Sequence, residues 1–156
     1  MRILLLVVSH AAALGMGFAF GIYLLPILTA PDGPPAEEIR SVASGAQFTT
    51  TFRRDLEDSD ALHWGEGTLF ISPELIAFEG RLAPGPDYRL YLSPEFVETE
   101  AGFKALKADM VQVGSVQTFE NFMVKVPATL DPAAFKAAIV WCETFGQFIT
   151  ATTYQR

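Results

Sequence analysis

Ala137-Ala138-Ile139-Val140-Trp141-Cys142-Glu143-Thr144-Phe145 is the stretch around which the rest of this chain is organised. It is rich in β-branched and aromatic residues, which favour strands, and it holds the only cysteine among the 156 residues. Successive side chains of a strand point to opposite faces of its sheet. The order of residues therefore predicts Val140 and Cys142 on one face of a strand, and Ile139 and Trp141 on the other.

Short β-rich runs surround this strand and are separated by turn-forming residues. Pro84-Gly85-Pro86-Asp87 is a strong turn signal, because proline and glycine interrupt regular structure. Strands are predicted at residues 48–52, 67–71, 75–79, 88–93, 110–116, 119–126, 138–145 and 147–154, and short helices at 100–108 and 131–136. Short strands with turns at this spacing are typical of an antiparallel β-sandwich or barrel, and we expect the sandwich. The sequence therefore predicts an all-β domain of this kind.

The amino-terminal segment is a long apolar run, in which no side chain from Ile3 to Ala30 carries a full charge. A transmembrane helix needs about 20 apolar residues, so one such helix is predicted ahead of the domain. A cleaved secretory signal is the alternative interpretation. The run is long for the apolar region of a signal peptide. The best candidate cleavage site ends at Ala30, and Pro31 is an unfavourable residue directly after a cut. Both observations favour an uncleaved anchor.

The chain divides into three parts on this basis: an anchor or signal segment at 1–30, a stiff and solvated linker at 31–45, and the β domain at 46–156. Arg2 precedes the apolar run and acidic residues follow it. Because positive charge stays on the cytoplasmic side, we expect a cytoplasmic amino terminus in the cell membrane and a periplasmic or extracellular domain. A cleaved leader would instead give a secreted protein.

Two further features bear on partners. Gly17 and Gly21 form a G-x-x-x-G motif on one helical face, which lets two helices approach closely and indicates a homodimer as one oligomeric form. The formal net charge is −7. An acidic surface repels phosphate backbones, so the composition excludes nucleic acid as a partner.

Cys142 and His63 are the candidate chemical residues, since His63 is the only histidine outside the apolar run. A buried, chemically inert cysteine is one interpretation, and a redox thiol or haem ligand is the other. One histidine and one cysteine are too few for a blue-copper site, and a closed zinc site would need carboxylates as well. Non-covalent haem, held by Cys142, His63, Met110 or Met123, stays open.

Four motifs occur in a fixed order: His63-x-x-x-Gly67, the Gly85-Pro86-Asp87 turn that opens a strand, Val113-Gly114, and Val140-Trp141-Cys142-x-x-Phe145. Together they resemble the DM-thirteen family, an electron-transfer domain of bacterial exported proteins and of animal proteins of the Skeletor and Knickkopf type, where it stands beside DOMON domains. The resemblance covers roughly residues 48–155. It implies a compact β-sandwich outside the cytoplasm, in which Cys142 is the hallmark cysteine, a free thiol or a haem ligand.

Two functions follow from these observations. The first is a membrane-tethered redox module, in which Cys142 changes oxidation state or binds haem, His63 is its partner at one cleft, and a redox or cell-envelope protein is the external partner. The second is a non-catalytic structural or binding module that presents the 83–87 loop to a protein or a polysaccharide, with Cys142 in the core. Neither function requires an independent enzymatic activity.

Overall fold

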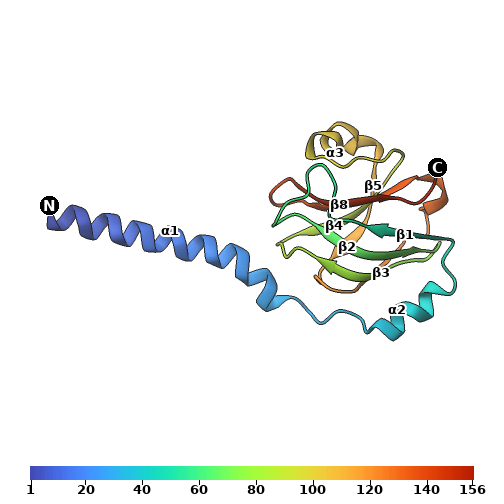
Figure 1. Ribbon diagram of the computed structural model, residues 1–156, viewed down its shortest axis with the longest axis horizontal. Coiled ribbons are helices and arrows are strands. Elements are labelled where there is room, and N and C mark those ends of the chain that lie inside the picture. Colours follow the sequence, from blue (N-terminus) through green and yellow to red (C-terminus); the bar gives the residue numbers. More distant parts are fainter.

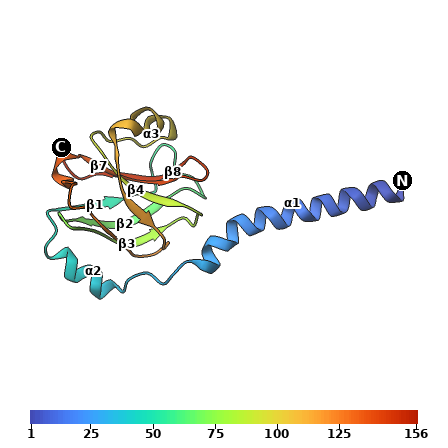
Figure 2. The ribbon, with the colours of Figure 1, turned by 180° about the vertical axis from the view of Figure 1, so that it is seen from behind.

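A computed structural model describes all residues from Met1 to Arg156. Helix α1 (Arg2–Thr29) projects from the β domain as a long rod (Figures 1 and 2). It is the one helix that is long and apolar enough to cross a membrane, judged by length and composition. Two four-stranded antiparallel sheets follow it, so the prediction of an all-β domain behind an apolar amino-terminal helix is confirmed.

The strand order is β1-β2-β3-β6 in the first sheet and β5-β4-β7-β8 in the second. The strands are β1 (Phe48–Phe52), β2 (Gly65–Ile71), β3 (Leu75–Leu82), β4 (Tyr88–Ser93), β5 (Val111–Val116), β6 (Phe122–Lys125), β7 (Ala137–Cys142) and β8 (Gln147–Thr153). The short helices are α2 (Ala36–Ala43), α3 (Glu100–Leu106), and the 3₁₀ turns η1 (Lys107–Asp109) and η2 (Pro132–Ala134). Figure 1 shows α3 outside the second sheet and α2 outside the first.

The β7 strand separates two apolar clusters. Val140 and Cys142 belong to a core cluster formed by residues of both sheets. Trp141 belongs to a second cluster beneath α3, where its ring stacks on that of Phe103. The predicted alternation of side chains along this strand is therefore confirmed.

Two predicted strands, 138–145 and 119–126, each lose three residues at one end in the structure. Strand β7 ends at Cys142, because residues 143–146 form the turn to β8 and Gly146 adopts a φ of 62°. Strand β6 begins only at Phe122. The preceding residues form a turn instead, in which the Thr118 hydroxyl donates to the backbone oxygen of Asn121.

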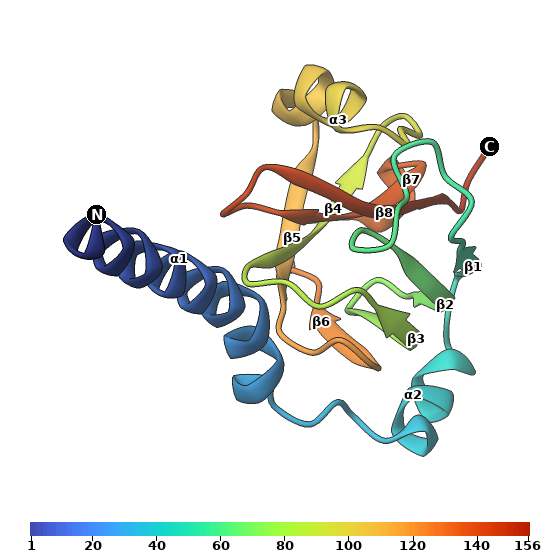
Figure 3. The ribbon, with the colours of Figure 1, turned by 60° about the vertical axis from the view of Figure 1, so that its left-hand side comes forward.

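The segment after α1 is packed against the domain and is less solvated than predicted. Ile39 of α2 is completely buried. The Asn121 side chain donates a 3.1 Å hydrogen bond to the backbone oxygen of Pro34. These contacts restrict the linker, and they bring the end of α1 to the side of the domain where the β3–β4 loop and the β7–β8 turn lie (Figure 3).

Candidate functional site

Cys142 lies at the end of β7 and is only 2% exposed. It nevertheless lines a cavity of about 130 Å³, which we call the cysteine pocket. The lining residues are Ile22, Tyr23, Leu62, His63, Pro84, Gly85, Pro86, Tyr88, Cys142, Phe145, Gln147 and Ile149. The structure thus places the two sequence-predicted site residues, Cys142 and His63, around one mostly apolar cavity.

Pro84, Gly85, Pro86 and Tyr88, around the start of β4, form one wall of this pocket. The Tyr88 hydroxyl donates a 2.8 Å hydrogen bond to the backbone oxygen of Ala83. Gly85 lies so close to the Tyr88 ring that a Cβ atom there would be 2.4 Å from the hydroxyl oxygen. Glycine is therefore required at residue 85 for this wall to close. Burial raises the pKa of Tyr88, which keeps its hydroxyl protonated as a donor.

His63 is held in place by Asp60. Its Nδ1 atom lies 3.0 Å from both carboxylate oxygens of Asp60, and its backbone N–H donates to Oδ1. The Leu62 backbone N–H donates to the same oxygen. These hydrogen bonds, with that of His63 the strongest influence, hold the pKa of Asp60 below its ordinary value. A carboxylate bonded to Nδ1 fixes the ring orientation and leaves Nε2 available to accept a proton.

Burial raises the pKa of the Cys142 thiol, and nearby backbone N–H groups only partly oppose this effect. The thiol is therefore protonated at neutral pH. Because the thiolate is the reactive form of cysteine, Cys142 needs a base to become a nucleophile. The structure argues against a thiol that is reactive through a lowered pKa.

His63 also lines a second cavity, of about 360 Å³, which is open and acidic. Its other lining residues are Glu57, Asp58, Ser59, Asp60, Glu100, Gln147 and Phe148. His63 and Gln147 are common to both cavities. His63 therefore lies between the apolar cysteine pocket and an open, polar cavity.

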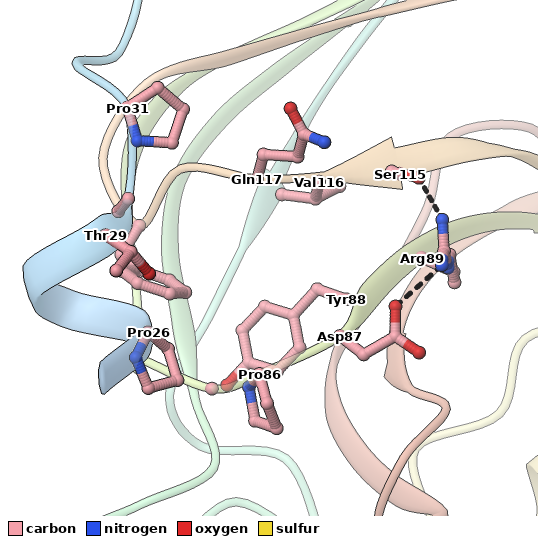
Figure 4. A pocket seen from close by; sticks show the side chains of 13 residues that line it. Pro26, Thr29, Pro31, Pro86, Asp87, Tyr88, Arg89, Ser115, Val116 and Gln117 are labelled. Atoms are coloured by element: carbon pink, nitrogen blue, oxygen red, sulfur yellow. Dashed lines mark hydrogen bonds and ion pairs between the residues drawn. The ribbon is translucent and has the colours of Figure 1, made fainter. Parts of the chain in front are cut away.

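A third cavity, of about 430 Å³, separates the end of α1 from β4 and β5 (Figure 4). Pro26 and Thr29 of α1 lie on one side of it, and Tyr88 lies opposite. Arg89 forms an ion pair with Asp87 at 2.7 Å and donates to the Ser115 hydroxyl. The ring of Tyr88, shared by this cavity and the cysteine pocket, forms the boundary between them.

The residues of the cysteine pocket do not fit haem in this conformation. An apolar cavity of about 150 Å³ holds a single benzene ring, and the cysteine pocket is of similar size at about 130 Å³, whereas a porphyrin has four pyrrole rings. Met110 and Met123 do not line the pocket. No group of three or more His, Cys, Asp or Glu side chains is arranged to hold a metal ion.

On the opposite side of the second sheet, Glu143 accepts hydrogen bonds from Lys107 at 2.7 and 2.8 Å and from the Tyr91 hydroxyl. Partial burial disfavours its charged form, but these two donors outweigh burial and lower the pKa of Glu143. Glu143 is therefore engaged away from the thiol. It connects η1 to the β7–β8 turn.

Replacing Lys107 with methionine is expected to lower the free energy of unfolding by about 1 kcal/mol at neutral pH. A carboxyl group whose pKa is lowered by folding stabilises the protein at pH values above its ordinary pKa, which is 4.5 for Glu143. This stabilisation is lost as the pH falls through the pKa of the folded state. The difference between the wild type and the variant should therefore shrink in acid. Urea denaturation at several pH values measures this difference.

The matched control is Lys104→Met, which breaks an exposed ion pair with Glu100. It should change the free energy of unfolding by about 0.5 kcal/mol or less. Equal effects of both variants would contradict this role of Glu143.

Sequence reasoning missed three contributors to the site. Asp60 was detectable, because an aspartate that binds the backbone N–H groups two and three residues later marks a local turn, here one that ends at His63. Ile22 and Tyr23 were not detectable, because nothing in an apolar run indicates which residues lie against a distant domain.

These features define a class: a small antiparallel β domain, on an apolar amino-terminal helix, with one cysteine in an apolar pocket. Residues 51–154 match the family described as Electron transfer DM13. Because this match covers more than half of the chain, the protein belongs to that family, and the resemblance drawn from the four motifs is confirmed. The family description supports a redox role in coarse terms. No curated protein and no solved structure matches the chain.

Proposed function

We propose that this chain is a membrane-anchored, extracytoplasmic electron-transfer domain whose redox group is the Cys142 thiol. One observation carries the proposal: the buried thiol and His63 line the same apolar pocket. A weak nucleophile is usually activated by a neighbouring base that a third group orients, and the shared pocket makes His63 the candidate base for Cys142. Here Asp60 is the orienting group.

The reaction that this arrangement favours is thiol–disulfide exchange with a small disulfide or with a disulfide of a redox or cell-envelope protein. The Cys142 thiol loses its proton and its sulfur forms a new S–S bond. The S–S bond of the partner breaks, and the departing sulfur is reduced to a thiol as it takes up a proton. A second thiol reverses the step. The incoming disulfide is the oxidant, so no cofactor is needed.

His63 acts as the base in this step. The raised pKa of Cys142 makes spontaneous ionisation rare at neutral pH. Proton transfer to the imidazole of His63 supplies the thiolate, and the solvent-open cavity that His63 also lines lets the proton pass on to water. The negative charge of Asp60 stabilises the imidazolium that forms.

The remaining features of the proposal concern location and assembly. The contact of Ile22 and Tyr23 with the cysteine pocket, which cleavage after Ala30 would remove, supports an uncleaved anchor. The sparse flanking charges support a cytoplasmic amino terminus. We interpret the two sheets with their common core as a β-sandwich. Gly17 and Gly21, which have no atoms of the chain within 4 Å of an added Cβ, are free for a homodimer contact.

The second candidate function is a structural or binding module without redox activity. Near-complete burial of Cys142 within the core cluster favours it. In this case the thiol packs like a small hydrophobic side chain, and the 83–87 loop is the surface for a protein or polysaccharide partner. The two functions differ in whether the thiol reacts in the folded chain.

Replacing His63 with glutamine is expected to slow exchange of the folded, detergent-solubilised chain with uncharged dithiodipyridine by about tenfold or more at neutral pH. The rate is followed by the absorbance of the released thiopyridone. Raising the pH should restore part of the loss, because hydroxide then ionises the thiol. The matched control is His10→Gln, which changes the only other histidine, on an exposed part of α1.

Equal rates for His63→Gln and His10→Gln would remove the base from the mechanism. A wild-type rate no faster than global unfolding, measured by hydrogen exchange of the slowest amides, would favour the structural module instead.

A further inference from the structure

Helix α1 is longer than a bilayer requires. Its 28 residues span about 42 Å at 1.5 Å per residue, whereas the hydrocarbon core is about 30 Å thick. With Arg2 at the inner boundary of the hydrocarbon core, roughly the last two turns would extend beyond it, toward the domain. In this part of the helix Ile22 and Pro26, and Ala30 just after it, are half-buried, while the residues between them are exposed. Their spacing of four places them on one face.

This face of α1 lies over the candidate site. Ile22 and Tyr23 line the cysteine pocket, and Pro26 and Thr29 line the adjoining cavity on the other side of Tyr88 (Figure 4). The opposite wall of the pocket is the 84–86 turn. The thiol is thus enclosed partly by the domain and partly by the helix that would enter the membrane.

We propose that the last two turns of α1 form a lid on the cysteine pocket, which opens toward the bilayer and admits uncharged, lipid-soluble disulfides in preference to charged ones. This inference rests on the proposed function, because it names the substrate class and the control of access for the same thiol. The occupant is a small apolar molecule with about one ring beside its reactive bond, as a volume near 130 Å³ allows.

Two observations support the selectivity. The pocket is lined mainly by apolar and aromatic side chains, and transfer of a charged group into such surroundings is unfavourable unless a partner compensates it. If the core begins at Arg2, a helix rising 1.5 Å per residue would leave it near Tyr23, the level at which aromatic side chains are enriched in membrane proteins. A molecule dissolved in the bilayer would therefore meet the lid without crossing the acidic outer surface.

The test compares two disulfides with the full chain in lipid nanodiscs: uncharged dithiodipyridine and the dianionic dithiobis(nitrobenzoate). Each rate is divided by the rate of the same reagent with the chain unfolded in urea, which removes the intrinsic difference between reagents. We expect the normalised rate of the uncharged reagent to be at least about tenfold higher in the wild type. The double variant Ile22→Ser/Tyr23→Ser should raise the rate of the dianion by about tenfold.

The control is Leu24→Ser/Leu25→Ser, which changes two exposed residues of the same helical turn that line neither cavity. It should leave both rates unchanged. Equal normalised rates for the two reagents in the wild type would overturn the proposal. So would equal effects of the two double variants, or an unreactive wild type.

The outcome is separable from that of the proposed function. His63→Gln should slow both reagents by the same factor and leave their ratio unchanged. If the two reagents react at equal normalised rates but His63→Gln still slows both, only the lid proposal is contradicted. If the uncharged reagent still reacts faster but His63→Gln has no effect, the role of His63 as base is contradicted and the lid proposal stands.

Discussion

Replacing Trp141 with alanine is expected to lower the free energy of unfolding by about 4 kcal/mol. The Trp141 ring is 2% exposed and stacks on Phe103 with a centroid distance of 3.9 Å. It joins α3 to the outer face of the second sheet, so its removal leaves a large cavity between them. Because small domains are stable by only about 5–15 kcal/mol, this single change removes a large share of the total. Urea denaturation followed by far-ultraviolet circular dichroism measures it.

Trp64 supplies the matched control, since the chain has two tryptophans. Trp64 is half-buried, and its main contact is the Arg54 guanidinium at 3.4 Å from the ring centroid. Replacing Trp64 with alanine should lower the free energy of unfolding by about 1 kcal/mol. Similar losses for the two variants would show that the Trp141–Phe103 stack does not anchor α3.

The second large effect is expected for Gly67→Ala, which should lower the free energy of unfolding by more than about 2 kcal/mol. Gly67 has a φ of 146°, which side chains rarely tolerate, and it pairs with Gly80 across β2 and β3. An added Cβ would lie 2.4 Å from the Glu79 backbone oxygen and 2.6 Å from the Gly80 Cα atom. The two glycines let β2 and β3 approach beneath the Phe78 ring.

The same substitution at Gly45 serves as the control. Its nearest neighbour would be the Val42 backbone oxygen at 3.8 Å from an added Cβ, an ordinary contact. Gly45→Ala should therefore change stability by less than about 1 kcal/mol. Thermal unfolding of both variants gives the comparison, and a Gly67 variant as stable as the Gly45 variant would contradict the strain argument.

Local patterns predicted most of the fold. The alternation along residues 139–142 correctly assigned Cys142 and Trp141 to opposite faces, because strand geometry fixes the direction of each side chain. The ends of the strands were harder to predict. The β-rich character of residues 143–145 predicted a longer β7, but Gly146 permits a tight turn there and the pairing with β8 requires it.

The candidate site was only partly predictable. Cys142 and His63 were identified from their rarity, but they lie in distant segments, and only the folded sheets place them at one pocket. The wall formed by Ile22 and Tyr23 depends on how α1 lies against the domain, which its uniform apolar composition does not encode. The raised pKa of Cys142 likewise depends on burial from both sheets. The raised pKa makes a base necessary for the redox thiol, a requirement that the sequence alone did not indicate.

The central claim is that Cys142 changes oxidation state in the folded protein. The most direct measurement is a redox titration of the full chain in nanodiscs with mixtures of mercaptoethanol and its uncharged disulfide, read by mass spectrometry and circular dichroism together. The account predicts one mercaptoethanol adduct per chain that forms and reverses while the spectrum stays native. An adduct that forms only when the native spectrum is lost would contradict it.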